Sequence, residues 1–413
     1  MPGKGRTTEF PRKDNIYKHK ESLPFDEAHS LVWVNRPYNK TSEDIKEWFA
    51  YSLIGLIVGT VTFIMKIMEE KLLEFGLHSM DKYTEDDEGN SHFVTPWLVY
   101  AFIAATWGFL GGLMTTYYGP AANGSGVAEV IGYLNGVNYP GFMQINTLLT
   151  KIIGVTFAVC AKLCVGKEGP LAHIGAIIGV CVIYLPFGFE HLQNDETKRL
   201  FVAAGASTGV SCAFGAPIGG ALFCYELSKP NTFWKFHMIW KVFFSCCLGT
   251  FTLAAFSGIA SGNFNDWSGA EIKFGVSNIE DVNIRRNVNV LSVLPNAIIL
   301  GIEGGLLGAL FINVNSRVNI LRSKLLKSKW MKPIETAFFG FLSASVFIAL
   351  PYLFKDHCFN MNLEEYEKNE HLYQTGWCPQ PENPEEISIN HFASINWASE
   401  GDIIKSIISS ENF

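Results

Sequence analysis

The chain has 413 residues, of which 48 % are hydrophobic, 14 % are aromatic and only 17 % are charged. Soluble domains carry about 25 % charged residues, so this composition excludes an ordinary soluble protein and indicates an integral membrane protein. The formal net charge is −7, and basic residues are scattered after the N-terminal segment, so nucleic acid is not expected as a partner.

Residues 1–45 are polar and are predicted to form an N-terminal arm. Basic residues are frequent in the first half of this segment. Because positively charged segments near membrane helices stay on the cytosolic side, we expect the arm to be cytosolic.

Apolar stretches follow the arm and predict membrane helices. They lie at about 48–65, 97–117, 148–165, 171–185, 200–227, 240–259, 293–314 and 333–353. Several are too short, or too interrupted by glycine and proline, to be simple spans. Transporters use such broken helices to bring helix ends to an ion near the middle of the membrane. The pattern therefore predicts an all-α, multi-pass membrane protein with an ion pathway.

The first polar motif in the apolar region is Gly124-Ser125-Gly126, followed by an amphipathic turn that ends at Asn135-Gly136. Flanking glycines leave backbone N–H groups accessible, and the Ser125 hydroxyl adds a neutral donor. Such a set of donors suits a weakly hydrated halide. A flexible loop is the alternative interpretation.

The second motif, Gly166-Lys167-Glu168-Gly169-Pro170, lies between two apolar stretches. A charged side chain at bilayer depth costs about 2.5 to 3.5 kcal/mol on insertion scales, so an acid there normally faces a partner or a water-filled pathway. Pro170 suits the first turn of a helix, and a helix N-terminus favours an anion. Glu168 could therefore compete with a permeant anion and act as a gate. An ordinary turn between two membrane helices is the alternative.

The third motif is a run of small residues at 203–209 and 214–220. Small residues let membrane helices approach closely, so we expect structural packing here. Glu226 follows as an acid in an apolar helix, for which we expect a structural hydrogen bond rather than a transport role.

With these three motifs in this order, residues 45–355 resemble the CLC family of chloride channels and chloride/proton exchangers. The family signatures GSGIP, G(K/R)EGP and AP(L/V/I)xG correspond to residues 124–128, 166–170 and the end of 205–220. The sequence that flanks these signatures looks most like that of the eukaryotic endosomal and lysosomal branch of the family. The resemblance implies an inverted-repeat helical fold and a homodimer in which each subunit has its own chloride pore.

The resemblance also implies roles for individual residues. Glu168 would be the gating glutamate. Residues expected to bind chloride are Ser125, Gly124, Gly126, Gly166 and Gly169. Residues expected to make the pore electropositive are Lys151 and Lys167.

Two departures from the family pattern affect these expectations. Ala128 replaces the proline of GSGIP, which loosens the expected helix start. Leu227 stands where exchangers commonly carry a second, proton-accepting glutamate, and a leucine cannot carry a proton. This residue favours a voltage-gated chloride channel. A chloride/proton antiporter remains the alternative, because two extra residues at 228–232 could shift the alignment.

The second half of the family's motifs is not found before Phe413. Residues 298–310 resemble the start of a second repeat, because Gly301 and Gly305 have the same four-residue spacing as Gly55 and Gly59 in the first helix. We favour an incomplete sequence, and a truncated, non-conducting or regulatory subunit is the alternative. The predicted domains are therefore the arm at 1–45, a transmembrane domain at 46–355 holding the first repeat and the start of the second, and an extracytosolic loop at 356–413.

Seven of the nine cysteines lie in apolar stretches and are expected to be packed thiols. The resemblance places the loop between Cys358 and Cys378 outside the cytosol, where oxidation is possible, so we predict a disulfide between them. No enzymatic activity, metal site or cofactor is expected, because His173 stands alone near Glu168 and residues 165–169 lack Walker-type spacing. Plasma membrane and endosomal or lysosomal membrane both remain open.

Overall fold

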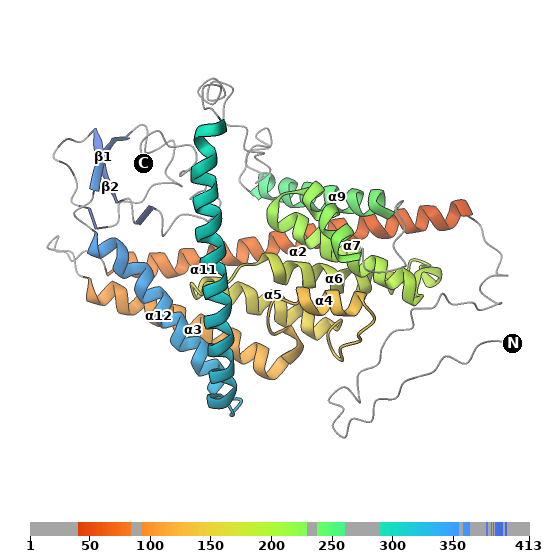
Figure 1. Cartoon of the computed structure of the whole chain (residues 1–413), viewed down its shortest axis with the longest axis horizontal. Coiled ribbons are helices and arrows are strands. Elements are labelled where there is room, and N and C mark those ends of the chain that lie inside the picture. Colours follow the sequence, from red (N-terminus) through yellow and green to blue (C-terminus); the bar gives the residue numbers. More distant parts are fainter. Residues whose placement is uncertain are drawn as a thin grey trace. The chain divides into compact units, whose positions relative to one another are not determined.

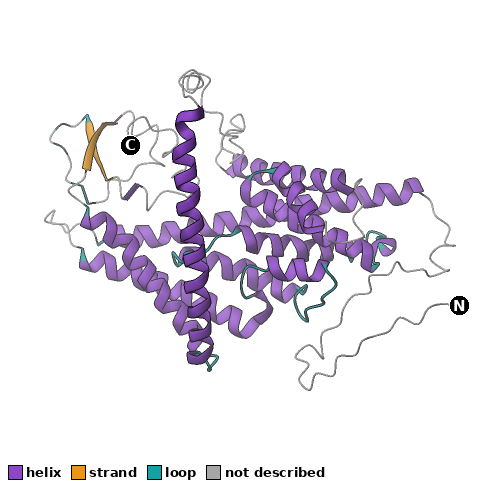
Figure 2. Ribbon diagram, viewed as in Figure 1, coloured by secondary structure: helices purple, strands orange, loops and turns teal. Residues whose placement is uncertain are grey.

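The computed structural model describes residues 40–83, 93–228, 238–260, 290–354, 358–363, 377–378, 381, 383, 385–390 and 393–394. Figures 1 and 2 show that most of this part is helical. Five of its helices are long and apolar enough to cross a membrane. The expectation of an all-α, multi-pass integral membrane protein is confirmed.

The helices follow the apolar stretches of the sequence in order (Figure 1). Their bounds are α2 (Lys40–Asp81), α3 (Val94–Leu113), α4 (Val127–Leu134), α5 (Ile145–Cys160), α6 (Glu168–Ile183), α7 (Asp195–Phe214), α8 (Pro217–Ser228), α9 (Met238–Ala260), α11 (Val290–Leu325) and α12 (Met331–Leu353). A π-helical turn at Met114–Tyr118 extends α3, and short 3-10 turns lie at Pro120–Ala122 and Glu190–Leu192.

The expected single stretch at 200–227 is wrong, because the structure divides it into α7 and α8. Helix α7 is capped at its start by Asn194, whose side chain accepts a hydrogen bond from the Thr197 N–H at 2.7 Å. The helix ends at Phe214 and is followed by Gly215, which has a left-handed backbone (φ 61°). Pro217 then opens α8. The glycine and proline thus act as a helix stop and start.

The described residues fall into two compact units, each made of three separate segments. The first unit takes residues from 1–62, 121–148 and 168–253, and the second from 63–120, 149–167 and 254–413.

Close backbone contact between α6 and α7 forms the core of the first unit. A Cβ atom at Gly175 would overlap the carbonyl oxygen of Gly205, and one at Gly205 would overlap the carbonyl oxygen of Gly175. A Cβ atom at Gly209 would likewise overlap the carbonyl of Leu171 on α6. The prediction that the small residues at 203–209 serve helix packing is confirmed.

Helix α9 covers the glycine face of α2 in the same unit. A Cβ atom at Gly55 would lie 2.8 Å from the Ser245 carbonyl oxygen, and one at Gly59 would lie 2.6 Å from that of Gly249. An ion pair joins the same two helices, with 2.8 Å between Lys241 Nζ and Glu47 Oε2.

In the second unit α3 packs along α12. A Cβ atom at Gly108 would lie 2.8 Å from the Thr336 carbonyl oxygen. The unit also holds a two-stranded antiparallel sheet of β1 (Cys358–Asn362) and β2 (Glu386–Asn390). No strand was expected in these segments. Cys358 is joined by a disulfide to Cys378, with 6.0 Å between their Cα atoms.

Candidate functional site

Ser125 lies in the turn that leads into α4. Gly126, immediately after it, is buried and has a left-handed backbone (φ 92°), which glycine adopts without steric cost. Helix α4 then begins at Val127, although Ala128 stands in place of the family's proline. No side chain caps this helix start. Its first N–H groups are therefore among those that a helix leaves without an intrahelical partner.

The second motif forms the start of α6. Glu168 is the first residue of this helix and is half-buried. Ser125 contacts this turn, since a Cβ atom at Gly169 would overlap the Ser125 hydroxyl oxygen. Glycine is therefore required at position 169 for the hydroxyl to lie where it does. The structure brings Ser125 to the first turn of α6, next to the residue that the sequence singled out as a gate.

Two helix N-termini thus meet at one hydroxyl. The turn before α4 carries Ser125, and the first turn of α6 packs against it. Helix N-termini present unpaired N–H groups and the positive end of the helix dipole, both of which favour a negative charge. Chemically, the arrangement can hold a small anion, or the carboxylate of Glu168 in its place.

His173 is a residue of this site that the sequence analysis left without a role. It is completely buried on α6, and its ring stacks on Phe142 with 3.9 Å between ring centroids. Its Nε2 atom lies 3.1 Å from the Phe142 carbonyl oxygen. A Cβ atom at Gly126 would lie only 2.6 Å from His173 Nδ1. His173 therefore fixes the start of α4 against α6. In the sequence, this contact is indicated only by the glycine at position 126.

Three other expected site residues belong to the second unit. Lys151 lies on α5 and is 1 % exposed. Gly166 is exposed in the segment before α6. The Nζ atom of Lys167 lies 3.7 Å from Oε2 of Glu69 on α2. The contact between Ser125 and Gly169 involves only residues of the first unit.

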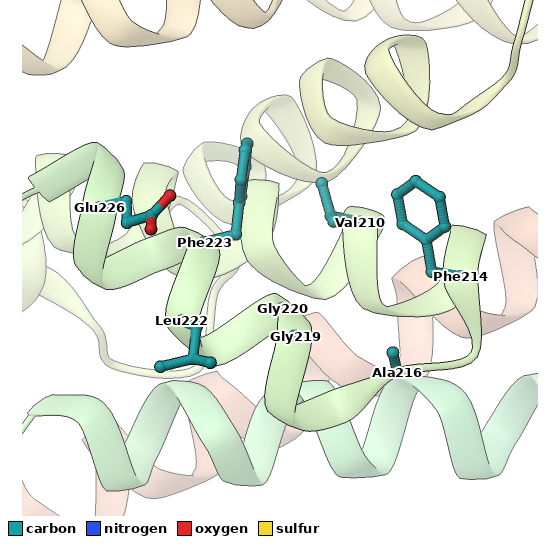
Figure 3. A pocket seen from close by; sticks show the side chains of 8 residues that line it. All are labelled: Val210, Phe214, Ala216, Gly219, Gly220, Leu222, Phe223 and Glu226. Carbon is teal, nitrogen blue, oxygen red and sulfur yellow. The ribbon is translucent and has the colours of Figure 1, made fainter. Parts of the chain in front are cut away.

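Glu226 and Leu227 are neighbours on α8 with opposite surroundings. Leu227 is buried, at 7 % exposure, whereas Glu226 is exposed. Glu226 lines an open, mostly apolar groove of about 370 Å³ between α7 and α8. Figure 3 shows Glu226 at one end of the lining residues and Phe214 of α7 at the other. None of the residues described in the structure supplies the hydrogen bond that we expected for this carboxylate.

Comparison with known proteins gives a consistent result. The family model described as "Voltage gated chloride channel" matches residues 107–364. The H(+)/Cl(-) exchange transporter 7 of Bos taurus is 32 % identical over 366 residues, which are 84 % of this chain and 44 % of the relative. Chloride channel protein A of Dictyostelium discoideum is 34 % identical over 334 residues, which are 78 % of this chain and 37 % of the relative.

Two solved structures share the fold. A slow cyanobacterial Cl-/H+ antiporter superposes with a TM-score of 0.58 at 22 % identity, over 74 % of this chain and 68 % of that one. A eukaryotic CLC transporter gives a TM-score of 0.55 at 19 % identity, over 78 % of this chain and 53 % of that one. The CLC-type helical fold implied by the resemblance is confirmed. The chain spans less than half the length of these two curated relatives.

Proposed function

Because the chain belongs to the voltage-gated chloride channel (CLC) family, we propose that it contributes to a chloride pathway gated by Glu168. The observation that carries this proposal is the contact of the Ser125 hydroxyl with the first turn of α6. Because of this contact, a neutral hydrogen-bond donor lies beside the N-terminus of α6, whose first residue is Glu168. A carboxylate there can leave the site to an anion or occupy it.

We propose further that transport is coupled to protons. The relatives matched at 31 to 32 % identity in four mammals are named H(+)/Cl(-) exchange transporters. They support the antiporter, which the sequence analysis kept as its alternative, better than the voltage-gated channel that it favoured. Leu227 was the reason for preferring a channel.

Glu226 offers a different proton carrier. Glu226 is exposed and lines the groove between α7 and α8, whereas the side chain at 227 is buried. An accessible acid one residue before the leucine can take up a proton that the leucine cannot. In this proposal Glu226 collects protons and Glu168 exchanges them against chloride.

The remaining expectations are part of the same proposal. Lys151 and Lys167 would add positive potential to the pathway, and backbone amides of Gly124, Gly166 and Gly169 would complete its anion sites. Two copies would form a dimer with separate pathways. Residues 1–45 would be a cytosolic arm, 46–355 the transmembrane domain and 356–413 an extracytosolic loop. The protein would transport an ion rather than catalyse a reaction.

Chloride efflux from liposomes tests the pathway. The samples are this chain and a fusion that adds the C-terminal remainder of the bovine exchange transporter. Glu168→Gln mimics the protonated gate and should change the rate and chloride dependence of efflux, whereas Glu303→Gln, a change to an exposed acid on α11, should not. Equal efflux from the parent and Glu168→Gln forms would reject Glu168 as the gate. Absence of efflux from both samples would reject the pathway.

A further inference from the structure

His173 is a buried ionisable residue that has only a structural role in the site described above. It is fully buried on α6, where its ring stacks on Phe142 with 3.9 Å between the ring centroids. An imidazole ordinarily gains or loses its charge between about pH 5 and pH 8. A proton on this ring would therefore add a positive charge to the interior of the first unit.

The contacts of His173 determine which ring nitrogen can change its protonation. Nε2 lies 3.1 Å from the Phe142 carbonyl oxygen, and a carbonyl oxygen can only accept a hydrogen bond, so Nε2 carries a hydrogen. A neutral imidazole has a single N–H group. The proton that His173 gains or loses is therefore bound at Nδ1, on the other side of the ring.

Nδ1 lies against the turn that carries Ser125. Gly126 follows Ser125 directly, and a Cβ atom at Gly126 would lie only 2.6 Å from His173 Nδ1. Helix α4 begins at the next residue, so this nitrogen lies beside a helix N-terminus, which carries partial positive charge. A proton on Nδ1 adds positive charge at the same turn. An anion held by the turn would offset the repulsion between the two.

Helix α7 places no ionisable side chain opposite His173. Gly209 packs against Leu171 and Gly205 against Gly175, so residues 205–209 lie beside His173, and none of them is ionisable. The charged residues of α7 lie near its other end, where Lys198 contacts Tyr184; they are Asp195, Glu196, Lys198 and Arg199.

Two acids on the remaining neighbouring elements could also bind a proton near the site. The ionisable residues on these elements are Glu129 and Tyr133 of α4, Tyr139 of the turn that carries Phe142, Glu168 and Cys181 of α6, and Cys212 of α7. Tyrosine and cysteine side chains ordinarily lose their protons only above pH 8. An experiment on His173 must therefore separate it from Glu129 and Glu168.

We propose that His173 is a proton site coupled to the anion site, so that a proton on Nδ1 and a chloride ion at Ser125 strengthen each other's binding. The coupling is reciprocal, because a proton that tightens chloride binding is itself bound more tightly when chloride is present. This inference rests on the proposed chloride site. It adds a proton-binding residue to Glu168 and Glu226.

Calorimetric titration of the full chain in detergent with chloride, at constant ionic strength, tests the inference. The Glu168→Gln form is used alongside the parent, because the carboxylate of the gate also takes up protons. Its chloride affinity should rise roughly fivefold as the pH falls through the histidine range, a value at the low end of coupling between two sites. Titrations in buffers of different ionisation enthalpy should show that protons are taken up as chloride binds.

His173→Gln in the same background removes the titrating nitrogen and keeps an amide N–H that can donate to the Phe142 carbonyl. This variant should bind chloride with an affinity that hardly depends on pH and without proton uptake. His78→Gln is the matched control, because it makes the same change at an exposed histidine of α2, and it should keep both effects. Glu129→Gln should also keep both effects.

Chloride binding without proton uptake in the Glu168→Gln form would overturn the inference, whether or not His173→Gln folds. Unchanged pH dependence in His173→Gln would also overturn it, because a merely structural role lowers the affinity equally at every pH. Loss of proton uptake in Glu129→Gln would assign the proton to that acid and overturn the inference as well. Absence of saturable chloride binding in the parent would reject the proposed pathway itself, whereas the other outcomes reject only the inference.

Discussion

The hydroxyl of Ser125 occupies the space that a side chain at Gly169 would need. Ser125 comes from the turn before α4 and Gly169 from the first turn of α6, and 43 residues of sequence separate the two positions. Each of the first two sequence motifs therefore contributes one side of a single contact. The contact explains why position 169, opposite Ser125, has room only for glycine.

Gly169→Ala should disturb this contact. The added methyl group would displace the hydroxyl or widen the gap between α4 and α6, and overpacking of this kind costs about 1 to 3 kcal/mol. A loss of about 1.4 kcal/mol in binding lowers anion affinity tenfold. Calorimetric titration with chloride measures the change. Gly219→Ala is the control, because its Cβ atom would lie at an ordinary 3.5 Å from Ala216. Unchanged affinity in Gly169→Ala would show that the hydroxyl does not bind the anion.

Gly126→Ala should destabilise the protein more than Gly124→Ala. Both glycines have a left-handed backbone, with φ of 92° and 76°, so both substitutions carry backbone strain of about 1 kcal/mol. Only Gly126→Ala would also clash with the His173 ring. Thermal unfolding in detergent, followed by size-exclusion chromatography, compares the two variants. Equal melting temperatures would mean that the His173 ring moves away from the added methyl group without a loss of stability.

Gly59→Ala and Gly305→Ala form another matched pair. Gly59 faces α9, where a Cβ atom would lie 2.6 Å from the Gly249 carbonyl, so the variant should lose about 1 to 3 kcal/mol of stability. At Gly305 on α11 a Cβ atom meets nothing within 4 Å among the described residues. Alanine should gain up to about 1 kcal/mol there through helix propensity. Thermal unfolding of both variants checks the contrast. Destabilisation by Gly305→Ala would indicate that another surface covers α11.

Thiol counting tests the disulfide. The sequence has nine cysteines, and the structure leaves seven of them as free thiols. The denatured, non-reduced protein should therefore react with seven equivalents of a thiol reagent and the reduced protein with nine. Cys358→Ser should give eight in both conditions. The cross-link spans 20 residues, and a loop near this length contributes about 3 kcal/mol, so reduction should also lower the melting temperature. A count of nine without reductant would contradict the bond.

The positions of most helices could be predicted from the sequence because long apolar runs nearly always form membrane helices. Glu168 could be singled out from the sequence because an acid in apolar surroundings is rarely neutral to function. The break between α7 and α8 was missed, since hydropathy is continuous through Gly215 while the backbone reverses its hand there. Helix α2 begins at Lys40, before its apolar part, because helix formation tolerates polar residues beyond the membrane.

Features that depend on contacts between distant segments could not be predicted. His173 stacks on Phe142, 31 residues away, and nothing in a single sequence pairs the two rings. The pairing of β1 with β2 also joins a segment inside the Cys358–Cys378 loop to a segment that follows this loop. Glu226 gave a clear signal as an acid in an apolar helix, but only the structure separates its exposed carboxylate from the buried side chain of Leu227.

The central claim is that chloride movement through the Ser125 and Glu168 site is coupled to protons collected by Glu226. The most direct measurement is proton movement in liposomes under an imposed chloride gradient and no opposing proton gradient, using the fusion that adds the bovine C-terminal remainder. The account predicts that chloride leaving the liposomes drives protons inward. Glu226→Gln should abolish the proton signal while chloride still moves, and Glu303→Gln should leave both unchanged. Chloride efflux without proton movement in the parent form would contradict the account and establish the channel that Leu227 first suggested.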